Sequence, residues 1–323
     1  IYSIKVLWAP VVDRLPLPWT VRFGQRRSWM LAGQLMIVIG LFTMPVVGSG
    51  DLWMLSLVAM LVAFGSATQD IAIDAYRIEA VIDEYQGAMS ATYIFGYRVA
   101  LLVAGAGALY LAEFFNWMFA YQMMAATGLV GVFTVLIIAE PDKQGRHDDA
   151  ERVVSYQIGE GSWQRFVRWF FGAVVAPFLD FFRRNGRFAL IILLFIALYK
   201  VSDIVMGIMA NPFYLDMGYS KSEIASVAKV FGFAMSVIGS FVCGVLVVRY
   251  GIYRPLLFGA VAVALTNLLF AMLADHKPEI VHLALVISAD NLSGGIATTA
   301  FVAYLSSLTN RAYTATQYAL FSS

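Results

Sequence analysis

The sequence of 323 residues contains 60% hydrophobic and 13% charged residues, with a net charge of +1. A soluble domain has about half apolar and about a quarter charged residues, so this composition excludes an ordinary soluble or nucleic-acid-binding domain. The only cysteine, Cys243, lies in an apolar run, and we therefore expect neither a disulfide framework nor a cysteine-rich metal site. The expected class is an all-α polytopic membrane protein.

Hydrophobic runs near the 20 residues that cross a bilayer occur eight times in full. They cover residues 28–48, 52–76, 88–111, 117–139, 187–212, 222–248, 255–274 and 280–308. Shorter apolar segments, Ile1–Val12 and Thr314–Ser323, are expected to be partial spans. We therefore expect a fragment with eight complete and two partial spans.

Basic residues alternate between the loops and predict the topology. The loops at 13–27, 77–86, 140–187, 249–254 and 309–313 contain many arginines and lysines, whereas the opposite loops contain only Lys221 and Lys277. The first set is predicted to be cytoplasmic. Residues 163–182 have an apolar core too short to span, and we expect an interfacial amphipathic helix there rather than a further span.

Two of the cytoplasmic loops repeat a pattern. Ala9-Pro10-Val11-Val12-Asp13-Arg14 precedes Gly24-Gln25-Arg26-Arg27, and Gly244-Val245-Leu246-Val247-Val248-Arg249-Tyr250-Gly251 precedes Arg254. This repeat resembles the loop signature of the major facilitator superfamily, although the second copy lacks the acidic residue. The resemblance implies two pseudo-symmetric six-helix halves, residues 1–139 and 187–323, joined by a cytoplasmic connection at 140–186. The expected gating residues are Asp13, Arg14, Arg26, Arg27, Arg249 and Arg254; the alternative is that they only fix the topology.

Charged residues inside the spans indicate function, because a charge at the bilayer centre is costly. Asp70 and Asp74 are four residues apart and share one helical face. Two carboxylates in a medium of low dielectric constant do not both ionise cheaply, so one is expected to hold a proton, as proton coupling requires. The alternative is structural pairing of Asp74 with Arg77 and of Asp70 with Arg98.

Lys200 and Asp203 are three residues apart and form either a structural ion pair or a pair that opens during transport. Further embedded polar residues are Lys5, Lys229, Asp290 and Asn291. The cations suit an anionic or zwitterionic solute, and the carboxylates suit a coupling proton. No constellation of nucleophile, base and metal is visible, so we expect neither an enzyme nor a bound cofactor.

Several polar motifs within the spans together resemble the anhydromuropeptide permease family of this superfamily. They are Trp8-Ala9-Pro10, Ser66-Ala67-Thr68-Gln69-Asp70-Ile71, Gly96-Tyr97-Arg98, Leu198-Tyr199-Lys200, Asp290-Asn291-Leu292-Ser293-Gly294-Gly295 and Ala315-Thr316-Gln317-Tyr318-Ala319-Leu320. The resemblance implies a bacterial inner-membrane transporter that imports cell-wall amino-sugar peptides into the cytoplasm for recycling with protons, and whose substrates also feed β-lactamase induction.

The residues expected to bind substrate or couple protons are Gln69, Asp70, Asp74, Arg98, Lys200, Asp203, Lys229, Asp290 and Asn291. Possible sugar-stacking residues are Tyr76, Tyr93, Tyr97, Tyr199 and Tyr304. We expect a monomer that works by alternating access. The alternatives are a related transporter of another anionic solute, such as acetyl-coenzyme A, and a muropeptide sensor that does not transport.

Overall fold

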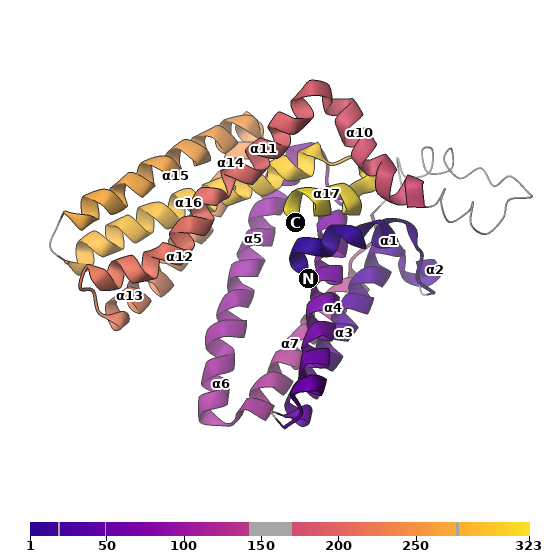
Figure 1. Ribbon diagram of the computed structural model, residues 1–323, viewed down its shortest axis with the longest axis horizontal. Coiled ribbons are helices and arrows are strands. Elements are labelled where there is room, and N and C mark those ends of the chain that lie inside the picture. The colour runs from indigo at the N-terminus through magenta and orange to yellow at the C-terminus, as the bar shows by residue number, and fades with distance from the viewer. Residues whose placement is uncertain (19, 49, 142–169, 276–277) are drawn as a thin grey trace, which may run out of the picture. The chain divides into compact units, whose positions relative to one another are not determined.

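The computed structural model describes residues 1–18, 20–48, 50–141, 170–275 and 278–323, and within these ranges the chain forms helices and turns but no strand (Figure 1). The α-helices of the amino-terminal part are α1 (Ala9–Arg14), α2 (Thr20–Phe23), α3 (Gln25–Val47), α4 (Leu52–Glu79), α5 (Gln86–Leu102), α6 (Ala108–Phe114) and α7 (Trp117–Ile137). Those that follow are α10 (Ala176–Asn185), α11 (Ala189–Tyr199), α12 (Val201–Asp216), α13 (Lys221–Val227), α14 (Phe233–Tyr250), α15 (Tyr253–Ala274), α16 (Ile280–Leu308) and α17 (Thr314–Ser322).

Shorter helical turns connect these helices. The 3-10 turns are η1 (Tyr2–Leu7), η2 (Asp83–Tyr85), η5 (Gly186–Phe188) and η7 (Arg311–Tyr313). Three π-helical turns, η3 (Val103–Gly107), η4 (Phe171–Val175) and η6 (Ala228–Gly232), continue directly into α6, α10 and α14. Such π turns are rare and are frequently found at functional sites.

Eight described stretches are long and apolar enough to cross a membrane, which confirms the predicted number of complete spans. They are Gln25–Val47, Leu52–Glu79, Asp83–Phe114, Trp117–Ile137, Phe171–Asp216, Phe233–Tyr250, Tyr253–Ala274 and Ile280–Leu308. Each overlaps one predicted span. Many large apolar side chains on these helices are exposed in the protein itself, among them Leu190 at 69% and Val245 at 67%, as a hydrocarbon surrounding requires.

The stretch from Phe171 to Asp216 is interrupted. Gly186 has a φ of +51°, which glycine adopts without steric cost, and it ends α10 before α11 begins. Because α11 and α12 together exceed the about 20 residues that a span needs, α10 is not required to cross the membrane. Of the predicted interfacial helix at 163–182, residues 163–169 lie outside the described ranges and the rest forms η4 and most of α10.

The chain divides into two compact units. The first comprises Ile1–Ala80, Leu101–Gly186 and Thr309–Ser323, and the second comprises Val81–Ala100 and Arg187–Leu308. Residues 81–100 and 309–323 thus pack with segments distant in sequence. The division into sequence halves at 1–139 and 187–323 concerns the internal repeat and stays a prediction.

In the first unit, α3 and α4 lie side by side because small residues face each other (Figure 1). A Cβ added to Gly33 would be only 2.8 Å from Cβ of Gln69, and one added to Gly65 would be 2.7 Å from Cβ of Met36. Close approach at small residues is the usual basis of helix association in membranes. A buried cluster joins these helices to α1, α7 and α17 through Ala9, Val12, Met30, Leu31, Ile71, Ala72, Ala75, Val135, Ala315 and Ala319.

In the second unit, α16 packs against both α14 and α15, again through glycine. A Cβ on Gly259 of α15 would be 2.8 Å from Cα of Ala297, and one on Gly295 would collide with the carbonyl oxygen of Ser236 on α14. The first residues of α5 belong to this unit, where Gly87 faces Val247. Because α16 is packed between α14 and α15, the polar side chains on α16 are held in place.

Candidate functional site

The first polar cluster lies along one side of α4. Nζ of Lys5, on η1, is 2.6 Å from Oδ2 of Asp70, and Lys5 is 4% exposed. The neighbouring side chains extend this contact, because Nε1 of Trp8 donates to Oγ1 of Thr68 at 3.2 Å and the Tyr2 hydroxyl contacts the Ser66 hydroxyl. Asp70 therefore pairs with Lys5 within the first unit.

Asp74, one helical turn after Asp70, has a different partner. Its Oδ1 is 3.3 Å from Nη2 of Arg77, and both side chains are buried. The Arg77 guanidinium also lies over the ring of Tyr318, 5.2 Å from the ring centroid. The pairing that the sequence offered as the structural alternative for Asp74 is thus present, and each of the two carboxylates on this face has a cation.

Gln69 and Arg98 have different surroundings. The Cβ of Gln69 faces Gly33 of α3, which places Gln69 on the packing side of α4. Arg98, on α5, is half-buried and belongs to the second unit. Within the described residues it forms no ion pair with a carboxylate.

The second polar cluster surrounds a break between two helices. Lys200 separates α11 from α12, its Nζ donates to Oγ1 of Thr298 at 3.1 Å, and it lies 5.7 Å from the ring centroid of Phe301. The Tyr199 ring stacks on the same Phe301 with 4.7 Å between centroids. Discontinuous helices typically form the substrate sites of secondary transporters. The side chains of Asp203 and Lys229 lie outside those that the structure describes.

Asn291 occupies a position between α16 and α14. Its Oδ1 accepts a hydrogen bond from the Ser236 hydroxyl at 3.0 Å, and its Nδ2 donates to the Ile287 carbonyl at 2.9 Å. A Cβ on Gly232, at the end of the π turn η6, would lie 3.3 Å from Nδ2 of Asn291. The backbone carbonyl of Asp290 accepts from Ser293. Asn291 therefore joins α16 to α14, and both ends of its amide form hydrogen bonds.

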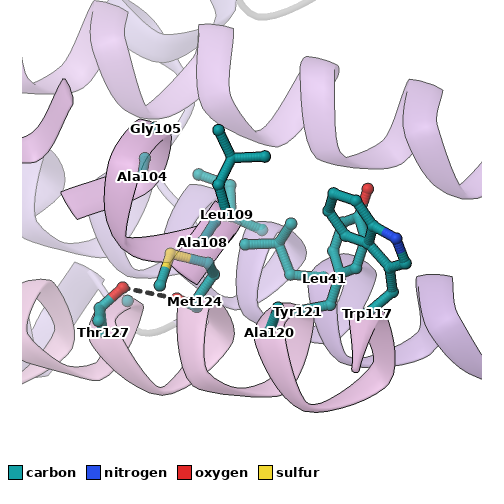
Figure 2. A pocket seen from close by; sticks show the side chains of 12 residues that line it. Leu41, Ala104, Gly105, Ala108, Leu109, Trp117, Ala120, Tyr121, Met124 and Thr127 are labelled. Carbon is teal, nitrogen blue, oxygen red and sulfur yellow. Dashed lines mark hydrogen bonds between the residues drawn. The ribbon is translucent and has the colours of Figure 1, made fainter. Parts of the chain in front are cut away.

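Each unit also contains a cavity. A cavity of about 240 Å³ in the second unit is lined by Tyr199, Ser202 and Asn267, with Asn267 donating to Ser202 at 2.7 Å. A larger one of about 640 Å³, shown in Figure 2, lies among α3, α6 and α7. Its side chains are mostly apolar, among them Leu41, Leu109 and Met124, so it is unsuited to a charged solute.

The predicted gating residues of the first loop form a buried ion cluster. Nη2 of Arg26 is 2.7 Å from Oδ1 of Asp13 and 2.7 Å from Oε1 of Glu79. The backbone N–H groups of Arg26 and Arg27 donate to Glu140 at 2.8 and 3.1 Å. Arg27 itself donates to the Val135 carbonyl, which fastens the start of α3 to the end of α7.

Asp13 also binds the amino end of α17. It accepts hydrogen bonds from the backbone N–H groups of Ala315 and Thr316, at 3.1 and 2.7 Å, and from the Thr316 hydroxyl at 2.6 Å. A carboxylate at a helix amino end is favourable because the first N–H groups have no partner within the helix. Arg14 lies beside this contact, over the ring of Tyr313.

The second loop copy is different. Arg249 lies over the ring of its neighbour Tyr250, and Arg254 is exposed. Neither forms an ion pair among the described side chains, in agreement with the missing acidic residue in the sequence of this copy. The structure therefore brings Asp13, Arg14, Arg26 and Arg27 together in the first unit.

Several participants were not selected from the sequence. Each of the following residues contacts a selected residue: Glu79, Glu140, Thr298, Phe301 and Thr316. Glu79 and Glu140 stand at the ends of apolar stretches, where acidic residues are common. Their positions in the sequence therefore gave little indication of a role in the ion cluster. The motif Ala315-Thr316-Gln317 was noted only as part of a family resemblance, and its contact with Asp13 has no local sequence signature.

The chain is similar to known proteins. The family described as Major Facilitator Superfamily matches residues 5–323. The Rickettsia felis protein that carries the name AmpG 4 is 36% identical over 328 residues, covering 100% of this chain and 75% of that protein. The anhydromuropeptide permease of Escherichia coli K12 is 33% identical over 325 residues, which are 99% of this chain and 61% of the permease.

A solved structure supports the fold. The proton:xylose symporter XylE, bound to 6-bromo-6-deoxy-D-glucose, matches with a TM-score of 0.61 at 13% identity, covering 98% of this chain and 74% of the symporter. The family match extends over nearly the whole chain, and these two relatives align with 100% and 99% of it. The chain therefore belongs to the Major Facilitator Superfamily and, within it, to the AmpG-type anhydromuropeptide permease family.

Proposed function

We propose that the protein imports anhydro-muropeptides, which are amino-sugar peptides from the cell wall, into the cytoplasm across the bacterial inner membrane. Transport is coupled to protons and proceeds by alternating access. The observation that carries the proposal is the ion pair of the buried Lys5 with the partly exposed Asp70, in a chain 33% identical to an anhydromuropeptide permease. The function of that relative supplies the substrate, and the pair supplies a group that can respond to a proton.

The Lys200 cluster suits part of such a substrate. A muropeptide carries carboxylates, which an ammonium group binds, and a sugar ring, which packs on an aromatic face. Lys200 and Tyr199 are consecutive residues at the helix break, and both contact Phe301. We assign Lys200 to a substrate carboxylate and Tyr199 to a sugar ring.

Asp70 is proposed to accept the coupling proton. Protonation of Asp70 would remove the counter-ion 2.6 Å from Lys5, which is 4% exposed. An unpaired cation inside a membrane protein is strongly unfavourable, so Lys5 and the segment η1 would have to move. The free energy of protonation is thereby converted into a change of conformation.

The contact between Asp13 and α17 is proposed to be the gate. It joins the end of α1 to a helix more than 300 residues further along the chain. Opening a path on this side of the membrane requires those hydrogen bonds to break. Arg26 keeps Glu79 as a partner when they do, so the guanidinium remains paired in both states.

Uptake into proteoliposomes tests the function. We expect radiolabelled anhydro-muropeptide to accumulate when an inward proton gradient is present, and not to accumulate without it. Asp70→Asn should lose accumulation against a gradient but retain exchange of substrate. The matched control is Asp51→Asn, because Asp51 caps α4 by accepting from Met54 and asparagine preserves such a cap.

Three results would contradict the proposal. Normal accumulation by Asp70→Asn would exclude Asp70 as the coupling residue. Gradient-independent uptake by the unmodified protein would exclude proton coupling. If folded protein took up acetyl-coenzyme A but no anhydro-muropeptide, the substrate would be a different anionic solute.

A further inference from the structure

The inner side of α10 is attached to the start of α17 by one glutamine. The side chain of Gln317 is fully buried. Its Nε2 donates to the Pro177 carbonyl and to Oδ2 of Asp180, both at 2.9 Å, and its Oε1 accepts from Nη2 of Arg184 at 3.0 Å. The same oxygen accepts from the backbone N–H of Asn310 at 2.8 Å, so the amide of Gln317 is fully used.

Apolar and polar contacts reinforce this attachment. The buried ring of Phe181 lies 5.1 Å from the ring of Phe321, on α17. Nδ2 of Asn310 donates to Oδ2 of Asp180 at 3.2 Å. Since Asp13 binds the first N–H groups of the same helix, α17 is held both by α1 and by α10.

The opposite side of α10 is exposed and apolar. Phe171, Leu179 and Phe182 are 53%, 39% and 39% exposed, and their spacing of eight and three residues places them on one face. We call these three residues the outer stripe. Pro177 and Phe181 lie on the other face and are buried. The exposed Arg183 follows Leu179 by one helical turn, beside the stripe.

The charge of this region is strongly positive. Residues 163–188 contain Arg165, Arg168, Arg183, Arg184 and Arg187, whereas Asp180 is the only acidic residue among them. Within the described part, Arg184 pairs with Asp180, and Arg183 forms no ion pair. A cluster of basic residues on an amphipathic helix directly before a membrane span matches the negative charge of anionic phospholipids.

We propose that the outer stripe and Arg183 form a binding surface for anionic phospholipid, and that α10 transmits lipid binding to α17 through Gln317. The stripe enters the headgroup region, and Arg183 binds a lipid phosphate. Bound lipid immobilises α10, which in turn stabilises the contact of α17 with Asp13. The proposal does not depend on which solute the protein transports.

Lipid proximity is measured first. Because Cys243 is buried, a cysteine in Phe182→Cys can be labelled selectively with a fluorophore. In vesicles with equal fractions of brominated lipid, we expect phosphatidylglycerol to quench the label more than phosphatidylcholine does. Arg183→Gln should lower that preference about fivefold, the effect of one basic group near a membrane surface. The control Arg22→Gln removes an exposed arginine of the loop before α3 and should leave the preference unchanged.

Hydrogen exchange then tests the connection to α17. In unmodified protein, amides of residues 314–322 should exchange several-fold more slowly in vesicles with phosphatidylglycerol than in phosphatidylcholine alone. Gln317→Ala and Arg183→Gln should both abolish this lipid dependence. Arg183 contacts neither α17 nor the hydrogen bonds of Gln317. The Arg183→Gln variant therefore remains informative if Gln317→Ala fails to fold. Equal quenching by the two lipids would refute the surface, and lipid-independent exchange of α17 would refute the transmission.

Discussion

Arg26 is 1% exposed and has two carboxylate partners, Asp13 and Glu79, each 2.7 Å from its Nη2. Buried charges are stable only when they are paired, so removal of the central cation leaves two carboxylates that repel each other. The pattern Asp13-Arg14 followed by Arg26-Arg27 was recognised from the sequence. The third partner, Glu79, was not, because it lies 53 residues away at the end of α4.

Arg26→Ala should therefore destabilise the protein by about 3–5 kcal/mol, as measured by its free energy of unfolding in detergent. Arg22 provides the control, since it is an exposed arginine in the same loop and Arg22→Ala should cost less than about 0.5 kcal/mol. Equal losses for the two variants would show that the ion cluster adds no stability.

Lys5 and Asp70 allow structural and transport roles to be separated. Lys5→Met and Asp70→Asn should each lower stability, because each leaves a partner without its counter-ion. The double variant removes both charges and should recover most of that loss, whereas it should not regain gradient-driven uptake. A double-mutant cycle of melting temperatures, with uptake measured on the same preparations, checks both statements.

Among the elements, α16 has two adjacent glycines with opposite surroundings. A Cβ on Gly295 would collide with the Ser236 carbonyl, whereas nothing lies within 4 Å of a Cβ on Gly294. Gly295→Ala should push α16 away from α14 and lower the melting temperature. Gly294→Ala should be neutral or stabilise the helix by up to about 1 kcal/mol, because alanine loses less backbone entropy. A larger loss at Gly294 would contradict the packing of α16 against α14.

The long apolar helices were predictable because hydrophobic run length directly reflects bilayer thickness, as Leu52–Glu79 and Ile280–Leu308 illustrate. The pairing of Asp70 with Lys5 was not predictable, since it depends on which helices are neighbours and on their rotation. The break at Lys200 likewise has no proline or glycine to mark it. The sequence could therefore locate charged groups within spans but not assign their partners.

For the whole molecule, the alternation of basic loops predicts a topology that chemical labelling can check. A cysteine in place of Gly50, between α3 and α4, should react with an impermeant thiol reagent on intact cells. A cysteine in place of Arg22, on the preceding loop, should react only after the membrane is permeabilised, and the buried Cys243 should not contribute. The reverse labelling pattern would invert the predicted orientation.

The contact of Asp13 with α17 also affects the order in which the protein is made. Asp13 leaves the ribosome 302 residues before Ala315, to which it later binds. At ordinary rates of translation this interval lasts about 15–60 s, during which α1 and α4 are exposed to the insertion machinery without α17. Arg26 and Glu79 emerge much earlier, and Arg26 can form its ion pairs with Asp13 and Glu79 in the meantime. Completion of the first unit is thus a late event in biogenesis, and truncation before residue 314 should yield a chain that inserts but is degraded rapidly.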